Sequence, residues 1–426
     1  MLSAQFIREN LDRVRADVAA RGADAPIDAI LTLDEQRRAL IGEVEGLRAE
    51  RNTASKAIGQ TQDAEERTQR IEAARALGDR LDGLEQQLRE TEASLQDALY
   101  EVPNILDPTA PHGADESENV VVDTVGVFRE FDFEPRPHWE VGEALDGIDF
   151  ARGVKMSGTR FFVLRGATAR LHRALTQWMI DWHVAAGFEE HYLPYMLTEE
   201  SFLASGHLPK FRENLYQDTE EDYLFIPTAE APFANLYRDE ILDPGVLPLR
   251  FVSHTPCFRR EKMSAGRETR GLKRVHQFEK VEMFSFCEPE QSGAELDLLV
   301  SRARSIPEEL GIPYRVLELC SGDLDFKASK GFDIDMWAPG QEEWMEVSSV
   351  SNTFDFQARR ARVRYRPEAG ARPRFPHMLN GSGLAPGRAL IAVIENYQQE
   401  DGAVTVPDVL QPYMGGITRI EPEASA

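Results

Sequence analysis

Cysteine is scarce in this chain of 426 residues, which contains Cys257, Cys287 and Cys320 and no others. Their spacing matches no metal-ligand motif, and so few thiols in a chain this long indicate a reducing compartment rather than a disulfide framework. Long hydrophobic runs are missing too, and the charged N-terminal segment lacks the apolar stretch of a secretory signal. We therefore expect a cytoplasmic protein with no membrane partner.

Positive charge is also in short supply, with 48 Lys and Arg against 73 Asp and Glu, for a formal net charge of -25. Polyanions are bound by Lys and Arg, so composition alone argues against a nucleic-acid partner. A local basic surface would have to overcome the repulsion from the net negative charge of the chain. Histidines are few, and His183, His191 and His207 are scattered among apolar and loop residues. Without clustered partners they are expected to be structural rather than metal ligands.

A proline-free region between Pro26 and Pro103 carries two apolar seams with helical spacing. The first follows alternating steps of four and three, the pattern of a coiled coil: Leu33, Arg37, Leu40, Val44, Leu47, Arg51, Ala54 and Ile58. A second seam runs from Leu77 to Ala98, and a turn near Gly59 to Asp63 would make the two helices antiparallel. At 1.5 Å per residue the arm would be roughly 50 Å long.

The predicted arm bears several cations, interleaved with acids such as Glu50 and Glu72, so it is not strongly basic. The candidates for contact with a polyanion are Arg48, Arg51, Lys56, Arg67, Arg70 and Arg75. From these residues alone, an ordinary solvated coiled coil with ion pairs on its flanks remains the simpler alternative.

The remainder of the chain reads as a mixed domain. Residues 103–119 are rich in Pro, Asp, Glu and Asn and are expected to form a linker. Residues 170–187 have the periodicity of an amphipathic helix, and short apolar segments such as YLFIP, VLPLRFVSH, EKVEMFSF and IPYRVLEL alternate with helical ones. This pattern predicts an α+β domain with a mainly antiparallel sheet.

The segment from Thr255 to Phe284 contains the most specific chemistry. Arg259 and Glu261 are two residues apart, so on a strand they would share a face, and Phe278, Lys280 and Glu282 repeat the alternation on the returning run. Arginines can clamp phosphate oxygens, and an aromatic ring can stack on a base. The loop between the runs is cationic, with Lys262, Arg267, Arg270, Lys273 and Arg274. A charged surface hairpin is the alternative.

This hairpin resembles motif 2 of the class II aminoacyl-tRNA synthetases, and in particular that of the bacterial-type seryl-tRNA synthetase family. IPTAEAP (Ile226 to Pro232) is similar to the family's serine-binding segment, and LNGSGLAPGRAL (Leu379 to Leu390) resembles motif 3. The resemblance implies an antiparallel class II catalytic domain over residues 120–426, a linker at 103–119, and an N-terminal tRNA-binding domain with a helical hairpin arm over 1–102.

The same resemblance implies a reaction in two steps. ATP and L-serine would form seryl-adenylate and pyrophosphate, and the seryl group would then pass to the 3' end of tRNA(Ser), and also of tRNA(Sec). Magnesium would assist at Glu346 and Ser349, the arm would grip the tRNA, and the helix-to-strand passage after residue 187 would lie in a homodimer interface.

Site residues are carried over by motif position. Arg259 and Arg388 would be catalytic. Serine would be bound by Thr228, Ala229, Glu230, Glu282 and Ser382. ATP would be bound by Arg259, Arg260, Glu261, Arg274, Val275, Phe278, Glu346, Val347, Ser348, Ser349 and Arg388.

Two other functions are considered. A class II paralogue could load a small amino acid onto a carrier protein, although such a protein is expected to lack the long arm. A coiled-coil scaffold with a degenerate nucleotide fold is the non-enzymatic alternative. Arg260, Lys262, Met263 and His207 depart from residues common in bacterial members of the family.

Overall fold

The computed structural model describes residues 1–262 and 270–422, which therefore leaves Met263 and Arg267 outside the described residues. The chain divides into two compact units. One consists of Leu2–Ala19 and Ala23–Pro103, and the other of Asn104–Ala426 with Met1 and Ala20–Gly22. The functional domain bounds given above remain a prediction.

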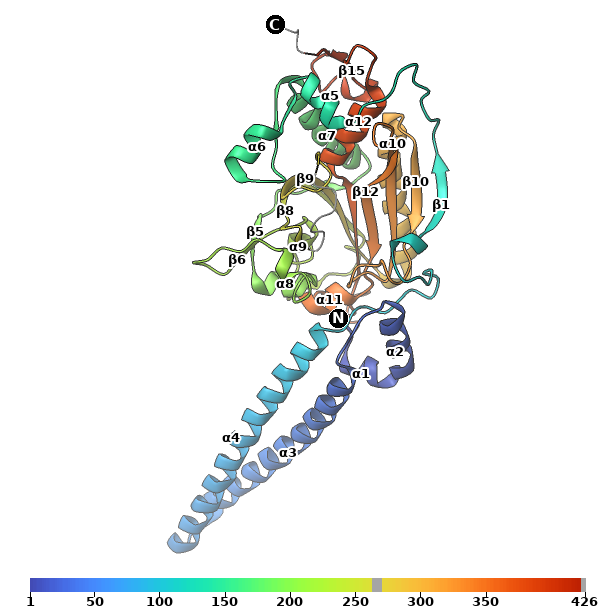
Figure 1. Ribbon diagram of the computed structural model, residues 1–426. Helices are drawn as coiled ribbons and strands as arrows, with labels where there is room; N and C mark the ends of the chain where they lie inside the picture. The colour runs from blue at the N-terminus through green and yellow to red at the C-terminus, as the bar shows by residue number, and fades with distance from the viewer. Residues whose placement is uncertain (263–269, 423–426) are drawn as a thin grey trace. The chain divides into compact units, whose positions relative to one another are not determined.

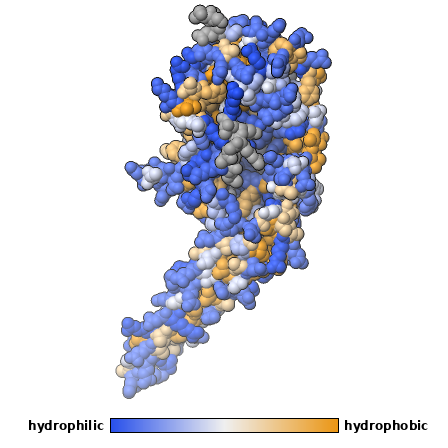
Figure 2. Space-filling view, in the orientation of Figure 1, coloured by the Kyte–Doolittle hydropathy of each residue, from blue (hydrophilic) through white to orange (hydrophobic). Residues whose placement is uncertain are grey.

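The first unit is helical, with α1 (Ala4–Glu9), α2 (Leu11–Ala20), α3 (Ile27–Gln60) and α4 (Ala64–Tyr100) (Figure 1). Asp63 begins α4, because its side chain accepts a hydrogen bond from the backbone N–H of Glu66 at 2.8 Å. Val44, Leu47 and Leu81 are buried between the two long helices. The predicted helical hairpin is confirmed, and hydrophilic residues alternate with hydrophobic ones along its visible face (Figure 2).

The second unit is built on an eight-stranded sheet. In spatial order its strands are β1 (Val120–Val125), β10 (Tyr314–Glu318), β11 (Lys330–Ala338), β12 (Glu343–Asn352), β14 (His377–Leu384), β9 (Gln277–Cys287), β8 (Leu249–Phe258) and β4 (Glu189–Glu190). The pairs in this order are antiparallel except β4 with β8. The predicted α+β class with a mainly antiparallel sheet is confirmed.

Helices α7 (Gly166–Ala185), α10 (Ser292–Leu310) and α12 (Pro386–Tyr397) pack on the sheet and form the main core with it. The amphipathic helix predicted at 170–187 is α7, which buries Leu171 and Leu175. Helices α8 (Glu199–Ser205), α9 (Glu230–Phe233) and α11 (Phe356–Ala361) belong to the same unit. The remaining elements are α5 (His138–Ala144), α6 (Phe150–Ser157), β2 (Ile148–Asp149), β3 (Val163–Leu164), β5 (Met196–Thr198), β6 (Tyr223–Phe225), β7 (Ile241–Leu242), β13 (Arg364–Tyr365), β15 (Val404–Thr405) and β16 (Arg419–Ile420).

Strand β9 separates two environments. Val281 and Met283 face the main core, whereas Phe284 and Phe286 pack in a second core with Phe233 of α9. Successive side chains on a strand point to opposite sides of the sheet, so the even-numbered positions of β9 share one face. Phe278, Lys280 and Glu282 lie on the same face as this second core, nearer the start of the strand.

The segment predicted to be a linker is packed rather than free. Leu106 and Ala110 are buried in a cluster with Leu319 and Leu324 of the same unit. The Asn104 side-chain amide donates hydrogen bonds to Lys327 O, Ser329 Oγ and Thr353 O at 2.8 to 2.9 Å. A few apolar side chains and the Asn104 amide therefore fix this segment to the second unit.

No helix within residues 1–262 and 270–422 is both long and apolar enough to cross a membrane.

Candidate functional site

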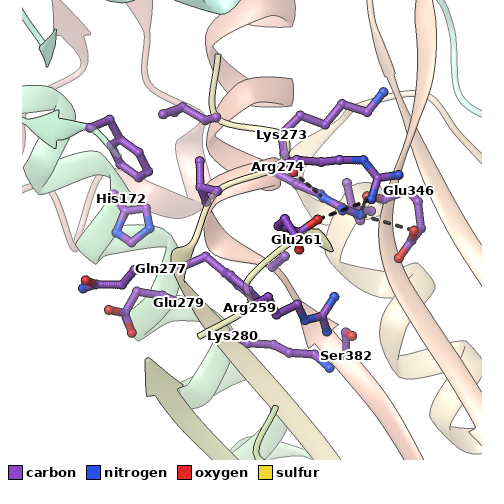
Figure 3. A pocket seen from close by; sticks show the side chains of 18 of the residues that line it. His172, Arg259, Glu261, Lys273, Arg274, Gln277, Glu279, Lys280, Glu346 and Ser382 are labelled. Atoms are coloured by element: carbon purple, nitrogen blue, oxygen red, sulfur yellow. Dashed lines mark hydrogen bonds and ion pairs between the residues drawn. The ribbon is translucent and has the colours of Figure 1, made fainter. Parts of the chain in front are cut away.

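A pocket of about 360 Å³ opens where β9, the end of β8, β12 and the start of α12 meet (Figure 3). It brings together many of the residues predicted for ATP and serine. Those that line it are Arg259, Glu261, Arg274, Val275, Phe278, Glu346, Val347, Ser349, Ser382 and Arg388.

The base of the β8–β9 hairpin places Arg259. Its backbone N–H donates to His276 O at 2.9 Å, and His276 Nδ1 lies 3.0 Å from Arg259 O. The expectation that Arg259 and Glu261 occupy a strand is wrong, because β8 ends at Phe258 and Glu261 has a φ of 52°. This left-handed turn nevertheless leaves the Glu261 carboxylate in the pocket, 3.8 Å from the Arg274 guanidinium.

Arg259 lies against the aromatic ring predicted to stack on adenine. Its Cζ is 5.1 Å from the centroid of Phe278, a cation–π arrangement, and its Nε donates to Pro227 O at 3.4 Å. Its guanidinium is therefore held between the hairpin and the segment that leads to Thr228.

Arg388 is in the first turn of α12 and approaches β12. Its Nη1 donates to Glu346 O at 2.6 Å and lies 3.3 Å from Glu346 Oε2, while its Nε donates to Lys273 O at 3.4 Å. These contacts link motif-like segments that are far apart in the sequence.

Two of the predicted serine-binding residues meet around Lys280, which is labelled in Figure 3. Lys280 Nζ lies 2.6 Å from Glu282 Oε2 and donates to Thr228 Oγ1 at 3.0 Å. Glu282 is buried, with 1% of the residue exposed, and pairs in register with Ser382 on β14. The alternation of β9 placed Lys280 on this face, but sequence reasoning assigned it no function.

Glu230 begins α9 and is also buried. Gln357 Nε2 donates to its carboxylate at 2.7 Å, and Lys327 Nζ lies 3.5 Å from it. His207 Nε2 is 3.9 Å away on the other carboxylate oxygen. Burial raises the pKa of Glu230 to about 7, although the nearby Lys327 ammonium lowers it.

Some predicted residues do not line the pocket. Ala229, Thr228, Glu230 and Glu282 are buried and lie outside its lining, and the buried Ser348 hydroxyl donates to Ser382 O at 2.6 Å. Arg260 is exposed, and its backbone N–H donates to Asn214 O at 2.9 Å.

The pair predicted to hold magnesium lies on β12, with Glu346 opposite Asp335 and Ser349 opposite Asp333 on β11. Burial and then the Glu346 charge hold the pKa of Asp333 well above its usual range, and its buried Oδ1 has no hydrogen-bond partner among the described residues. In the described part of the chain no three His, Cys, Asp or Glu side chains converge as metal ligands. Magnesium commonly takes one or two protein oxygens together with water and phosphates, so a carboxylate and a hydroxyl fit it.

The six cations predicted to contact tRNA are all exposed on α3 and α4. Arg48 pairs with Glu85 across the hairpin at 2.8 Å, and Arg70 pairs with Glu66 on its own helix at 2.7 Å.

Comparison with known proteins finds family models that match both the N-terminal part of the chain and its sheet-containing part. The family model described as "Seryl-tRNA synthetase N-terminal domain" matches residues 1–106, and "tRNA synthetase class II core domain (G, H, P, S and T)" matches residues 210–397. A serine–tRNA ligase of Thermomicrobium roseum is 56% identical over 99% of this chain and 95% of that protein. The chain belongs to the seryl-tRNA synthetase family. A serine–tRNA ligase of a Roseiflexus species is 55% identical over 98% of this chain and 99% of its own length.

Solved structures of family members agree. The seryl-tRNA synthetase from Pyrococcus horikoshii, complexed with ATP, superposes with a TM-score of 0.93 at 36% identity and covers all of both chains. The cytoplasmic enzyme from Naegleria fowleri, in complex with AMP, has a TM-score of 0.88 at 32% identity over 100% of this chain and 99% of that one. The family fold predicted from the sequence motifs is thereby confirmed.

Sequence reasoning missed the residues that surround Glu230 in this family member. Gln357 and Lys327 stand far from Glu230 along the chain, and no motif spacing connects them with it.

Proposed function

We propose that this chain activates L-serine with ATP to form seryl-adenylate, and transfers the seryl group to the 3' end of tRNA(Ser) and of tRNA(Sec). Both the name of its full-length relatives and the ATP bound in the Pyrococcus horikoshii structure support this function. A carrier-protein ligase is not favoured, because the similarity to serine–tRNA ligases extends through the helical arm.

The arrangement of one pocket is the observation on which this proposal depends. Arginines and Phe278 line one end, and the buried Glu282 lies beyond Lys280 at the other. A nucleotide offers phosphates and a flat base to the first end, whereas an amino acid offers an ammonium group to the second.

The first step needs no protein nucleophile, because the carboxylate of serine is already ionised and can attack the α-phosphate. The chain would position the two reactants and neutralise the charge that develops. Arg259 would bind the α-phosphate, Arg274 the terminal phosphates, and Arg388 would cover the face of adenine opposite Phe278. Glu261 would accept a hydrogen bond from the adenine amino group.

Glu346 and Ser349 would hold magnesium, which supplies positive charge to the phosphates when bound. Val275 and Val347 would contribute to the walls around the nucleotide, and the buried Ser348 would support them from outside the lining. Arg260 would contact the nucleotide only from an exposed position.

Serine would be selected by two buried carboxylates. Glu282 would receive the ammonium group, with Thr228 and Ser382 beside it, and Glu230 would accept a hydrogen bond from the hydroxyl. A buried acceptor left without its donor is costly, so alanine would be rejected.

The exposed arm cations would contact tRNA through its phosphates and shape, as suits an RNA helix. A homodimer is proposed because β4 is an edge strand of the large sheet, with Tyr192 exposed two residues after it. Unpaired strand edges readily pair with another chain.

Exchange of pyrophosphate into ATP, measured with each of the common amino acids, tests the activation step. Serine should support exchange and alanine should not. Charging of purified tRNA(Ser) and tRNA(Sec), beside a carrier protein, tests the acceptor. Exchange without dependence on serine would contradict the proposal.

A further inference from the structure

One wall at the nucleotide end of the pocket is an irregular segment, residues 270–276, which leads into β9. Four of its residues line the pocket: Leu272, Lys273, Arg274 and Val275. The Arg274 side chain points toward Glu261, 3.8 Å away (Figure 3). A segment outside helices and strands keeps a fixed shape only where other groups bind its backbone. The groups that hold this backbone therefore decide where Arg274 lies.

His138, the first residue of α5, holds this backbone at Leu272. The backbone N–H of Leu272 donates to His138 Nε2 at 3.0 Å, and both residues are buried. Gly271 permits this close approach, because its φ is 84° and a Cβ at this position would clash with the imidazole. Since Nε2 accepts a hydrogen bond, the proton of the neutral ring is on Nδ1.

Glu395 of α12 fixes the imidazole from its other side. Glu395 Oε1 lies 2.9 Å from His138 Nδ1, and neither side chain is exposed to solvent. The same oxygen accepts from the backbone N–H of His138 at 2.9 Å and from Gln341 Nε2 at 2.8 Å, while Oε2 accepts from the Gly340 N–H at 2.9 Å. The carboxylate thus has three donors besides the ring, so it stays in place whatever the ring does.

Helix α12 is in this way attached to two consecutive residues of the segment. Arg388, in its first turn, donates from Nε to Lys273 O at 3.4 Å. Glu395, about two turns further along the helix, reaches Leu272 through His138. The two attachments fix the segment relative to the helix that carries Arg388.

Resting on the function proposed above, we infer that His138 is a positioning residue for ATP. It holds Leu272 so that Arg274 reaches the terminal phosphates while Arg388 covers the adenine. His138 lies outside the pocket lining and acts through the backbone of Leu272. AMP has the adenine and the α-phosphate of ATP but not its terminal phosphates. Loss of the His138 acceptor should therefore weaken the binding of ATP and spare that of AMP.

The test is calorimetric titration of the full-length protein with ATP and with AMP, each in the presence of magnesium. In His138→Asn the side-chain amide takes the place of Nδ1 and still donates to Glu395, but it is too short to reach Leu272. A buried N–H then lacks its acceptor, so ATP should bind roughly tenfold more weakly. AMP should bind as it does to the unaltered protein.

His138→Gln separates positioning from a general loss of packing. Its side-chain oxygen takes the place of Nε2 and can accept from Leu272, while Glu395 keeps its three other donors. The affinity for ATP should recover at least in part. In pyrophosphate exchange, His138→Asn should raise the KM for ATP and leave the KM for serine unchanged, whereas general destabilisation would not distinguish the two substrates.

His377→Asn is the matched control, because His377 packs on Phe354 with ring centroids 5.0 Å apart and does not line the pocket. It should change neither affinity. Equal weakening of ATP and AMP binding in His138→Asn, or no weakening of either, would overturn the inference. Failure of the unaltered protein to bind ATP would instead contradict the proposed function.

Amide hydrogen exchange in the unaltered protein without nucleotide is a second measurement, and it does not require any variant to fold. The Leu272 N–H should be protected, because a buried imidazole accepts from it. Exchange of this amide at the rate of an unprotected one would overturn the inference.

Discussion

Gln357 donates a hydrogen bond from Nε2 to the carboxylate of Glu230 at 2.7 Å, and so joins α11 to the start of α9. The same amide donates to Ser205 O at 2.9 Å. Because Gln357 is fully buried, it cannot exchange these partners for water. It fixes the carboxylate for which we propose the serine hydroxyl as a ligand, and this carboxylate also titrates in an accessible range.

Glu230 should make the stability of the protein depend on pH. Its folded-state pKa is raised by burial from 4.5 to about 7, so between these values the folded protein keeps a proton that the unfolded chain has lost. Stability is therefore greatest below this window and falls as the pH rises through it, by roughly 3 kcal/mol for this group. Urea unfolding at pH 5 and pH 7.5 should show this loss in the unaltered protein but not in Glu230→Gln. Identical pH dependence in both would contradict it.

Arg259→Ala should abolish adenylate formation while leaving the fold intact. A charge clamp that strengthens as the phosphorus centre reacts contributes about 3 kcal/mol or more, a loss of roughly a hundredfold or greater in rate. Pyrophosphate exchange measures this loss, and thermal unfolding should change little. Near-normal exchange in the folded variant would exclude Arg259 as the clamp.

Arg250→Ala provides the matched contrast on the same hairpin. Arg250 makes two parallel contacts with the buried Glu295, at 2.7 and 2.8 Å, outside the pocket. Its loss should destabilise the protein by about 3 kcal/mol, because it leaves a buried carboxylate unpaired. Exchange activity per folded molecule should be retained.

Glu282→Gln should weaken serine binding much more than ATP binding. The substitution keeps the shape of the side chain but removes the negative charge opposite the ammonium, and it introduces an amide that donates toward Lys280. The apparent affinities of both substrates can be read from exchange kinetics. Comparable losses for the two would place Glu282 outside the serine pocket.

Charge reversal on the arm should impair tRNA charging alone. Lys56, Arg67 and Arg75 are exposed, so replacing all three with Glu should not disturb the hairpin core around Leu81. The KM for tRNA should rise and become less dependent on salt, as expected when phosphate contacts are lost. Serine-dependent exchange should be unchanged. Arg89→Glu changes another exposed site on α4 and is the control. An equal rise of the KM for tRNA in this variant would show that added negative charge anywhere on the arm impairs charging.

Periodicity and motif order predicted much of this molecule, for reasons that are local. The seam containing Val44 and Leu47 predicts a helix because burial every three or four residues leaves few alternatives, and the alternation around Lys280 predicts a strand in the same way. At Glu261 the local pattern failed, since the chain turns with a positive φ immediately after β8.

Contacts between segments that are distant in the sequence could not be predicted from periodicity or motif order. The partnership of Lys327 with Glu230 and the packing of Leu106 against Leu319 depend on tertiary folding, which no spacing within a short segment encodes. The family motifs predicted that Arg259 and Arg388 share a pocket. They could do so because the resemblance is to proteins that already have this tertiary fold.

The alternation of β9 limits the ways in which this enzyme can diverge. A single substitution at Lys280 or Glu282 alters one side of the strand and leaves Val281 and Met283 in the core. Inserting or deleting one residue would instead send the charged residues into the core and the apolar ones into the pocket. A scan of insertions and deletions through β9 should therefore abolish folding and activity together, so that descendants can retune substrate choice here by replacement but not by changes in length.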